Sequence, residues 1–355
     1  MYNIRIVKKT FAFTFEARTS RGTMPDRTCW FIRLSRKDQP EKEGIGEIAP
    51  LQGLSLEDEN LIEQELKVLI SLIENSTCSL TSDTNLLENL FELQQFSSSV
   101  RFGAVMALLD LYHGGERKVF DSPFFLGNAI PINGLIWMAD TDTMLYHAEK
   151  KIREGFNCIK FKVGGLDFDD ECMLLRNIRE KYPADRLIIR LDANGAFGLE
   201  DVHQKLTRLS EFSIHSIEQP VKPLLWLQNP ELLHDSPIPV ALDEQLIGRF
   251  TLGEKKRLLQ KLRPAFLVLK PGLIGGFVET GEWISVAEEL SIGWWMTSAL
   301  ESPLGLNAIA QFTSIYHPTL PQGLGTGQVF SNLFSHPLEV EDGKLSLNSS
   351  KNWGF

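Results

Sequence analysis

The chain has 355 residues, 43% of them hydrophobic, and a formal net charge of −10. This length exceeds one ordinary domain and fits a barrel of about 200–250 residues with a smaller domain beside it. No block rich in Lys and Arg resembles a phosphate-binding stripe, so a nucleic-acid partner is not expected. No apolar run approaches the ~20 residues that span a membrane, and the N-terminus lacks the apolar core of a signal peptide. These features predict a cytoplasmic protein with no membrane partner.

The first 127 residues are predicted to form an α+β domain. Apolar residues alternate at positions 4–15 and 29–34, which favours strands. The polar segment between them, Arg18–Arg27, contains a glycine and a proline and predicts a long hairpin loop. From about Glu57 to Tyr112 the apolar spacing becomes helical. Strands followed by helices indicate a domain distinct from the rest of the chain.

Residues 128–329 are predicted to form a modified TIM-type (β/α)-barrel, because short apolar strands alternate there with amphipathic helices. The expected strands are Pro131–Leu135, Cys158–Val163, Leu187–Asp192, Ser216–Glu218, Val240–Asp243, Phe266–Lys270, Trp294–Ser298 and a weaker, glycine-rich eighth at Gly323–Gly327. In the tail, Leu338–Val340 and Lys344–Leu347 resemble a hairpin. We expect residues 330–355 to pack back on the first domain.

Two lysines, Lys160 and Lys162, share one face of an expected barrel strand. Ile159, Phe161 and Val163 occupy the other face, which helices would cover, so the lysines are expected in the barrel lumen. Two buried ammonium groups are costly unless carboxylates or a metal site compensate them. The pair therefore predicts a charged site rather than a solvated edge strand.

Three carboxylates supply such a site. Asp192, Glu218 and Asp243 end consecutive expected strands and are 26 and 25 residues apart, about one βα unit each. They should meet at the top of the barrel, where barrel active sites lie. Hard oxygen ligands without His or Cys favour Mg²⁺, with Mn²⁺ as the alternative. Glu244 follows Asp243. The strand register favours Asp243 as the metal ligand, and Glu244 would contact the ligands rather than the metal.

A third lysine, Lys270, ends the next strand after four apolar residues and directly before Pro271. It is expected to face the same pocket from the side opposite Lys160 and Lys162. The alternative interpretation of such a lysine is a structural ion pair.

Taken in order, the motifs KFK, DANGAF, EQP, ALDEQL and KPGLIGG resemble the enolase superfamily, and more narrowly its muconate-lactonizing subgroup. The likeness covers nearly the whole chain, including GIGEIAPL in the first domain. It implies that this domain caps the barrel, and that Arg18–Arg27 and the segment from Gly44 to Ser55 form a lid that sets specificity.

The resemblance also implies roles for the site residues. Asp192, Glu218 and Asp243 would hold the metal, which neutralises the charge of an enediolate as it develops. Lys162 would be the base, and Lys160 would tune it and contact the substrate carboxylate. Lys270 would be a second base in a racemase or epimerase, or a stabilising cation in a syn-dehydration.

The sequence around the last two expected barrel strands predicts the reaction. Dipeptide epimerases of this subgroup usually carry an acidic pair on strand eight, but this sequence has no acid between Gln311 and Glu339. TSALESPLGL and GLGTGQ resemble instead the o-succinylbenzoate synthase family of menaquinone biosynthesis, whose substrate is a carboxylate. The substrate-binding residues expected are Asn194, Ser298 and Thr326.

Two alternatives remain at this point. One is an N-acylamino acid racemase or dipeptide epimerase on the same scaffold. The other is a non-catalytic barrel that binds a ligand, although such a protein has no physical reason to retain six ionisable lumen residues. Assembly into a homo-oligomer is left open.

Overall fold

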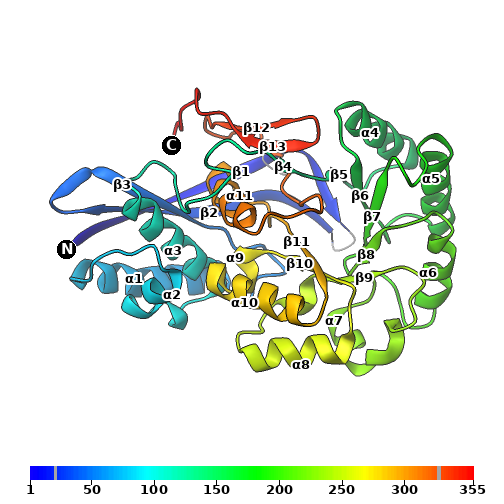
Figure 1. Ribbon diagram of the computed structural model, residues 1–355, viewed down its shortest axis with the longest axis horizontal. Coiled ribbons are helices and arrows are strands. Elements are labelled where there is room, and N and C mark those ends of the chain that lie inside the picture. The colour runs from blue at the N-terminus through cyan, green and yellow to red at the C-terminus, as the bar shows by residue number, and fades with distance from the viewer. Residues whose placement is uncertain (20–21, 326–328) are drawn as a thin grey trace.

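The computed structural model describes residues 1–19, 22–325 and 329–355. These residues form a seven-stranded sheet in the order β11-β10-β9-β8-β7-β6-β5 and two three-stranded sheets, β1-β2-β3 and β12-β13-β4. Figure 1 shows the β1–β3 sheet and the first helices on one side and the barrel on the other. The predicted fold, a modified (β/α)-barrel with an α+β domain beside it, is confirmed.

The N-terminal part is an antiparallel meander covered by helices. Its strands are β1 (Tyr2–Thr19), β2 (Gly22–Arg36) and β3 (Gln39–Ile48), and its helices are α1 (Glu59–Asn75), α2 (Thr84–Leu90), the 3₁₀ turn η1 (Leu93–Gln95) and α3 (Ser98–Tyr112). Helix α3 packs closely on β3 because Gly46 has no side chain: a Cβ there would lie 1.8 Å from the carbonyl oxygen of Gly103. The glycines of GIGE therefore serve packing.

The prediction of a loop at Arg18–Arg27 is wrong for the described residues of that segment. Strands β1 and β2 continue into this segment, with Arg18 opposite Thr23 and Thr19 opposite Gly22, after a register shift between Ala12 and Ala17. An antiparallel ribbon satisfies its backbone hydrogen bonds without burying apolar side chains. Polar composition alone therefore could not distinguish this extended hairpin from a loop.

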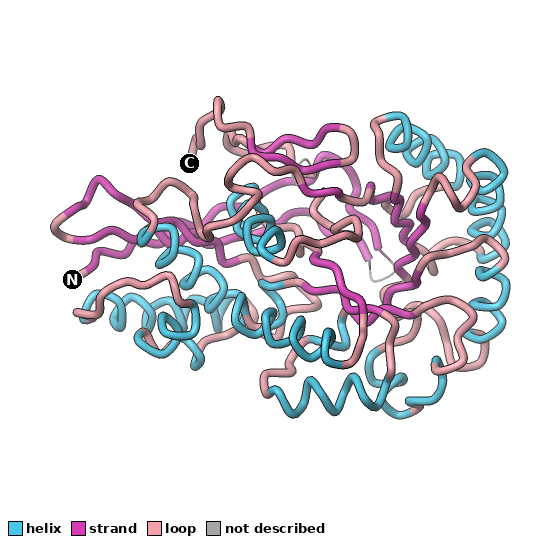
Figure 2. Tube along the Cα trace, viewed as in Figure 1, coloured by secondary structure: helices cyan, strands magenta, loops and turns pink. Residues whose placement is uncertain are grey.

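The barrel strands are parallel and short. They are β5 (Gly134–Ile136), β6 (Cys158–Lys162), β7 (Ile188–Asp192), β8 (Ser216–Glu218), β9 (Val240–Leu242), β10 (Phe266–Leu269) and β11 (Gly293–Met296). Their connections contain α4 (Thr141–Arg153), α5 (Phe168–Lys181), α6 (Val202–Ser210), α7 (Pro223–Gln228), η2 (Pro230–Leu233), η3 (Glu244–Leu246), α8 (Leu252–Leu262), α9 (Pro271–Ile274) and α10 (Gly276–Glu289), and α11 (Pro303–Ile315) follows β11. Figure 2 shows helices lying outside these strands, which leaves the inner face for the site.

The barrel closes differently from the prediction. Pro131, expected to begin the first barrel strand, lies instead with Ile130 in β4 (Ile130–Pro131), which pairs antiparallel with β13. Of the described residues in the expected eighth strand, Gly323 forms an isolated bridge with Thr297. Gln322, just before that strand, forms another with Ile132. A Cβ at Gly323 would lie 2.2 Å from the hydroxyl of Thr297, so glycine permits this close approach. Residues 326 and 327 of that expected strand lie outside the described residues.

The tail forms the expected hairpin, β12 (Leu338–Glu341) and β13 (Lys344–Leu347). Aromatic side chains of the tail pack on the N-terminal sheet. The ring centroids of Phe330 and Phe13 are 4.8 Å apart, and those of Phe355 and Phe31 are 4.5 Å apart. The domain boundaries at 127/128 and 329/330 remain a prediction.

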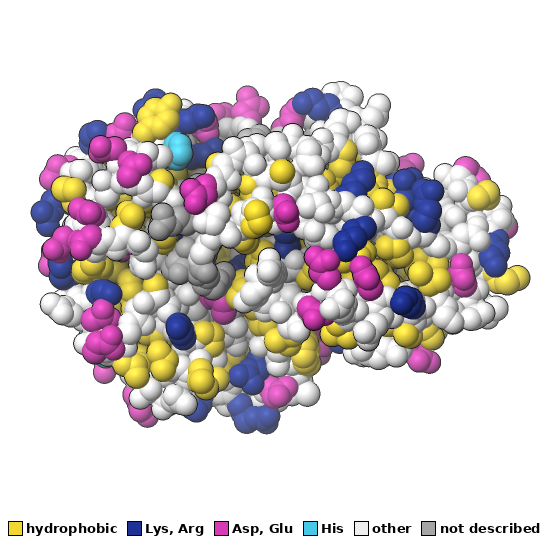
Figure 3. Space-filling view, turned by 180° about the vertical axis from the view of Figure 1, so that it is seen from behind, with side chains coloured by type: hydrophobic (Ala, Val, Ile, Leu, Met, Phe, Trp, Pro, Cys, Tyr) yellow, Lys and Arg dark blue, Asp and Glu magenta, His cyan; other side chains and the backbone are white. Residues whose placement is uncertain are grey.

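Charges of both signs are interspersed on the face of the molecule shown in Figure 3. Within the described part of the chain, no helix combines the length and the apolar character needed to cross a membrane. The expectation that nucleic acid is not a partner stays a prediction.

Candidate active site

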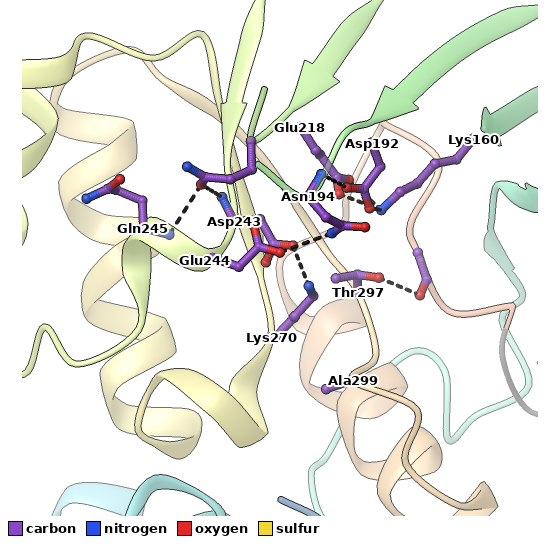
Figure 4. A network of polar contacts seen from close by, with 12 residues as sticks. Lys160, Asp192, Asn194, Glu218, Asp243, Glu244, Gln245, Lys270, Thr297 and Ala299 are labelled. Atoms are coloured by element: carbon purple, nitrogen blue, oxygen red, sulfur yellow. Dashed lines mark hydrogen bonds and ion pairs between the residues drawn. The ribbon is translucent and has the colours of Figure 1, made fainter. Parts of the chain in front are cut away.

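Three buried carboxylates meet at the carboxyl ends of neighbouring strands. Asp192 ends β7, Glu218 ends β8 in register with it, and Asp243 directly follows β9. One oxygen of each lies within 4.8 Å of the others, and their exposed fractions are 1%, 0% and 2%. Figure 4 shows the three side chains gathered at one place. Parallel strands end at one edge of the sheet, so carboxylates one βα unit apart converge.

This donor set fits a hard divalent cation. All three ligands are carboxylate oxygens, which suit Mg²⁺ or Mn²⁺ better than the softer metals that prefer sulfur or imidazole. Buried carboxylates at such short separation also repel one another unless cations lie between them. Glu244 stands apart from this group: its Oε1 accepts a hydrogen bond of 3.0 Å from the Asn194 amide.

Backbone turns of unusual conformation hold the carboxylates in place. Asn194 and Gln219, just after Asp192 and Glu218, have backbone φ angles of +47° and +39°, a region that residues other than glycine rarely adopt. The buried Gln219 side chain accepts hydrogen bonds of 3.3 Å from the backbone N–H groups of Asp243 and Gln245. One amide thus ties the turn after β8 to the turn after β9.

The three lysines compensate these carboxylates. Lys160 Nζ donates to Glu218 at 2.5 and 2.8 Å and lies 2.9 Å from Asp192. Lys162 Nζ lies 2.6 Å from Asp192, and Lys270 Nζ lies 2.5 Å from Asp243. Strands β6 and β10 are four places apart in the sheet order. Lys162 and Lys270 therefore approach the site from opposite walls of the barrel.

The surroundings set Lys162 apart from the other two lysines. Burial lowers the pKa of Lys162, and the charges of Lys160 and Lys270 add to this against the attraction of Asp192. Burial acts in the same direction on Lys160 and Lys270, but nearby carboxylates outweigh it and raise the pKa of both. For Asp192, burial is outweighed by the lysines, which hold its pKa well below the ordinary value. Lys162 is therefore best suited to lose its proton and act as a base.

A cavity of about 500 Å³ opens above these groups, within the size range of small-molecule sites. It is lined by Gly22, Thr23, Met24, Leu51, Gln52, Gly53, Leu54, Asn133, Leu135, Trp137, Lys160, Lys162, Asp192, Asn194, Lys270, Thr297, Ser298, Ala299, Leu300, Gly323 and Gly325. Parts of both expected lid segments thus lie at the cavity, as do Asn194 and Ser298. Thr326, expected to bind substrate, lies outside the described residues.

Sequence reasoning did not single out two other polar lining residues. Asn133 is 3% exposed, and its side-chain oxygen has no hydrogen-bond partner among the described residues. The hydroxyl of Thr297 donates to the carbonyl of Gly323 at 2.9 Å. Thr297 lies within the motif TSALESPLGL and Asn133 within the expected strand Pro131–Leu135, but which side chain faces the lumen depends on the irregular closure of the barrel. The Gln219 side chain was missed too, because its target is a distant turn.

Comparisons with known proteins show the family to which the chain belongs. The family model described as Enolase C-terminal domain-like matches residues 143–354. The chain is 42% identical to an o-succinylbenzoate synthase of Desulfotalea psychrophila, over 95% of this chain and 96% of that protein. It is 28% identical to an N-succinylamino acid racemase of Thermus thermophilus, over 97% and 90% of the two chains.

The fold leads to the same group of proteins. The crystal structure of MenC from Desulfotalea psychrophila superposes with a TM-score of 0.85 at 38% identity, covering 98% of this chain and 99% of that one. Sequence and fold agree over nearly the full length, and the family model alone spans more than half of it. The chain therefore belongs to the Enolase C-terminal domain-like family of the enolase superfamily.

Proposed function

We propose that this protein dehydrates a succinyl-substituted hydroxycyclohexadiene carboxylate to o-succinylbenzoate. The observation that carries the proposal is the 42% identity to the Desulfotalea psychrophila o-succinylbenzoate synthase over 95% of this chain. The N-succinylamino acid racemase of Thermus thermophilus and the epimerases of Francisella tularensis and Cytophaga hutchinsonii are more distant, at 28%, 24% and 27% identity.

The charges in the cavity support a substrate with carboxylates. Among the described lining residues, the ionisable side chains are Lys160, Lys162, Lys270 and Asp192. The sequence has no Asp or Glu between Gln311 and Glu339 to pair with a substrate ammonium group. A buried ammonium without a counter-charge would be heavily penalised, which disfavours a dipeptide.

In the proposed reaction, Lys162 Nζ accepts the α-proton next to the ring carboxylate. The electron pair of the broken C–H bond then forms the new ring double bond as the C–O bond breaks. Lys162 returns the proton to the departing hydroxyl, which leaves as water, and the ring becomes aromatic. A Mg²⁺ ion held by Asp192, Glu218 and Asp243 would supply positive charge against the enediolate carboxylate.

The other lysines hold charge throughout. Lys160 keeps its proton beside Glu218 and Asp192, where it lowers the pKa of Lys162, and it would pair with the substrate carboxylate. Lys270 also keeps its proton, and it stabilises the delocalised anion from the opposite wall.

The direct test is to incubate purified protein with the cyclohexadiene precursor and Mg²⁺ and to quantify o-succinylbenzoate by liquid chromatography. We expect Mg²⁺-dependent product that EDTA abolishes. A Lys162→Ala variant should lose activity by a factor on the order of 10²–10⁴, the usual worth of a general base. No product from folded, Mg²⁺-loaded wild-type protein would reject the proposal.

A second candidate is racemisation of N-succinylamino acids, favoured by the position of Lys270 opposite Lys162 and by the Thermus thermophilus relative. Incubating one enantiomer in D₂O separates the two reactions. A racemase incorporates deuterium at the α-carbon of recovered substrate and forms the other enantiomer, and a pure dehydratase does neither.

A further inference from the structure

Arg27, on strand β2, joins the N-terminal domain to the barrel beside the cavity. It is only 3% exposed. Its guanidinium donates to the carbonyl of Pro50, to that of Ala49 at 2.5 Å and to that of Ala299 at 2.9 Å. Two of these carbonyls follow β3, and the third follows β11. A single side chain thus connects segments 250 residues apart in sequence.

Both connected segments form the cavity wall. Residues 51–54 continue directly from Ala49 and Pro50, and residues 297–300 surround Ala299. Arg27 itself is not among the residues that line the cavity. It therefore acts on the cavity through the backbone of the segments it holds.

The same guanidinium compensates a buried acid, Glu301, which lies near a second one, Glu47. Glu47 accepts hydrogen bonds from the N–H and hydroxyl of Ser302 at 2.7 and 2.6 Å, and Glu301 accepts one from the N–H of Ala299 at 2.6 Å. Burial raises the pKa of Glu301 to about 7, and the charge of Arg27 opposes that rise. The junction therefore combines backbone hydrogen bonds with charge balance.

We propose that Arg27 is a positioning residue that holds residues 49–54 against residues 297–301 and thereby sets the affinity of the cavity for substrate. This inference rests on the proposed function. Arginine suits the task because its planar fork offers five donors, enough for three carbonyls at once, whereas a lysine ammonium offers three from one point.

The test compares Arg27→Ala and Arg27→Lys with a control, Arg33→Ala. Arg33 lies on the same strand, and its guanidinium pairs with Glu43 away from the cavity. For Arg27→Ala we expect KM to rise by a factor on the order of 10–100 while kcat changes little, because the held segments contribute binding rather than proton transfer. Arg27→Lys should recover part of the loss, and added guanidinium ion should lower the KM of Arg27→Ala.

Two measurements separate positioning from general stability. Amide hydrogen exchange at residues 51–55 should be faster in both Arg27 variants than in Arg33→Ala, while Mg²⁺ binding followed by calorimetry stays at the wild-type value. Wild-type KM and wild-type exchange in a folded Arg27 variant would overturn the inference. If Arg27→Ala does not fold, the exchange in Arg27→Lys decides the matter.

The exchange measurement also keeps this inference distinct from the proposed reaction. If the wild-type protein forms no o-succinylbenzoate, the proposed function fails. Faster exchange at residues 51–55 in the Arg27 variants would still support the positioning role of Arg27, and unchanged exchange would refute it.

Discussion

Replacing Lys270 with methionine tests whether this residue acts as a cation or as a base. Its Nζ lies 2.5 Å from Asp243, and the carboxylates of Asp243 and Glu244 outweigh burial and raise its pKa. A unit charge about 4 Å from developing negative charge contributes about 4 kcal/mol at an effective dielectric constant of about 20, or about 10³ in rate. We therefore expect kcat for dehydration to fall by about 10²–10³ in Lys270→Met, and by about tenfold in Lys270→Arg, which keeps the charge.

The assay is steady-state dehydration of the cyclohexadiene precursor with saturating Mg²⁺, beside Mg²⁺ titrations that show each variant to be loaded. The two substitutions make the reasoning refutable. Equal loss in Lys270→Arg and Lys270→Met would mean that charge alone is not what Lys270 supplies, and a proton-transfer role would follow. Activity of Lys270→Met within about tenfold of wild type would show that the cation is unimportant.

Two other predictions concern the metal site and stability. Glu218→Gln should weaken Mg²⁺ binding by more than about tenfold in calorimetry, because it neutralises one of three buried oxygen ligands. The exposed control Glu211→Gln should leave Mg²⁺ binding unchanged. Equal Mg²⁺ affinities of the two variants would show that Glu218 is not a metal ligand. Burial raises the pKa of Glu88 from 4.5 to about 7, so the native state holds this proton at pH values where the unfolded chain has lost it. The free energy of unfolding should therefore fall by up to about 3 kcal/mol as the pH rises through that window, a loss that persists above pH 7. In urea unfolding, Glu88→Gln should be more stable than wild type at pH 8 and similar at pH 5; the same difference at both pH values would contradict this.

The core of the site was predictable because simple periodicities place it. Lys160 and Lys162 share a strand face through the two-residue repeat, and the structure turns both toward Asp192. Asp192, Glu218 and Asp243 recur once per βα unit, and the structure gathers them within 4.8 Å. Such regular spacing survives in sequence because barrel strands end at one level.

Features that depend on long-range contacts were not predictable. Arg27 reaches a carbonyl 272 residues away, and the Gln219 amide hydrogen-bonds a turn on the next strand. No periodicity links such residues. The pairing of β4 with β13 was missed for a related reason, since Ile130–Pro131 lies only two residues before a barrel strand yet hydrogen-bonds to the C-terminal hairpin.

The charge balance narrows the substrate, and Lys270 narrows the reaction. Three ammonium groups face the buried carboxylates of Asp192, Glu218, Asp243 and Glu244. Lys162 must be unprotonated to act as the base, so the charges of Lys160, Lys270 and a divalent cation would balance these four carboxylates. No carboxylate is then left to pair with the ammonium group of a dipeptide, which disfavours that substrate. The proposed precursor and an N-succinylamino acid both carry two carboxylates, so charge cannot separate a dehydratase from a racemase. The role of Lys270, on the side of the barrel opposite Lys162, can separate them. Racemisation needs a proton transferred on each face of the α-carbon, whereas syn-elimination needs one base and a fixed cation. The paired substitutions of Lys270 measure that difference.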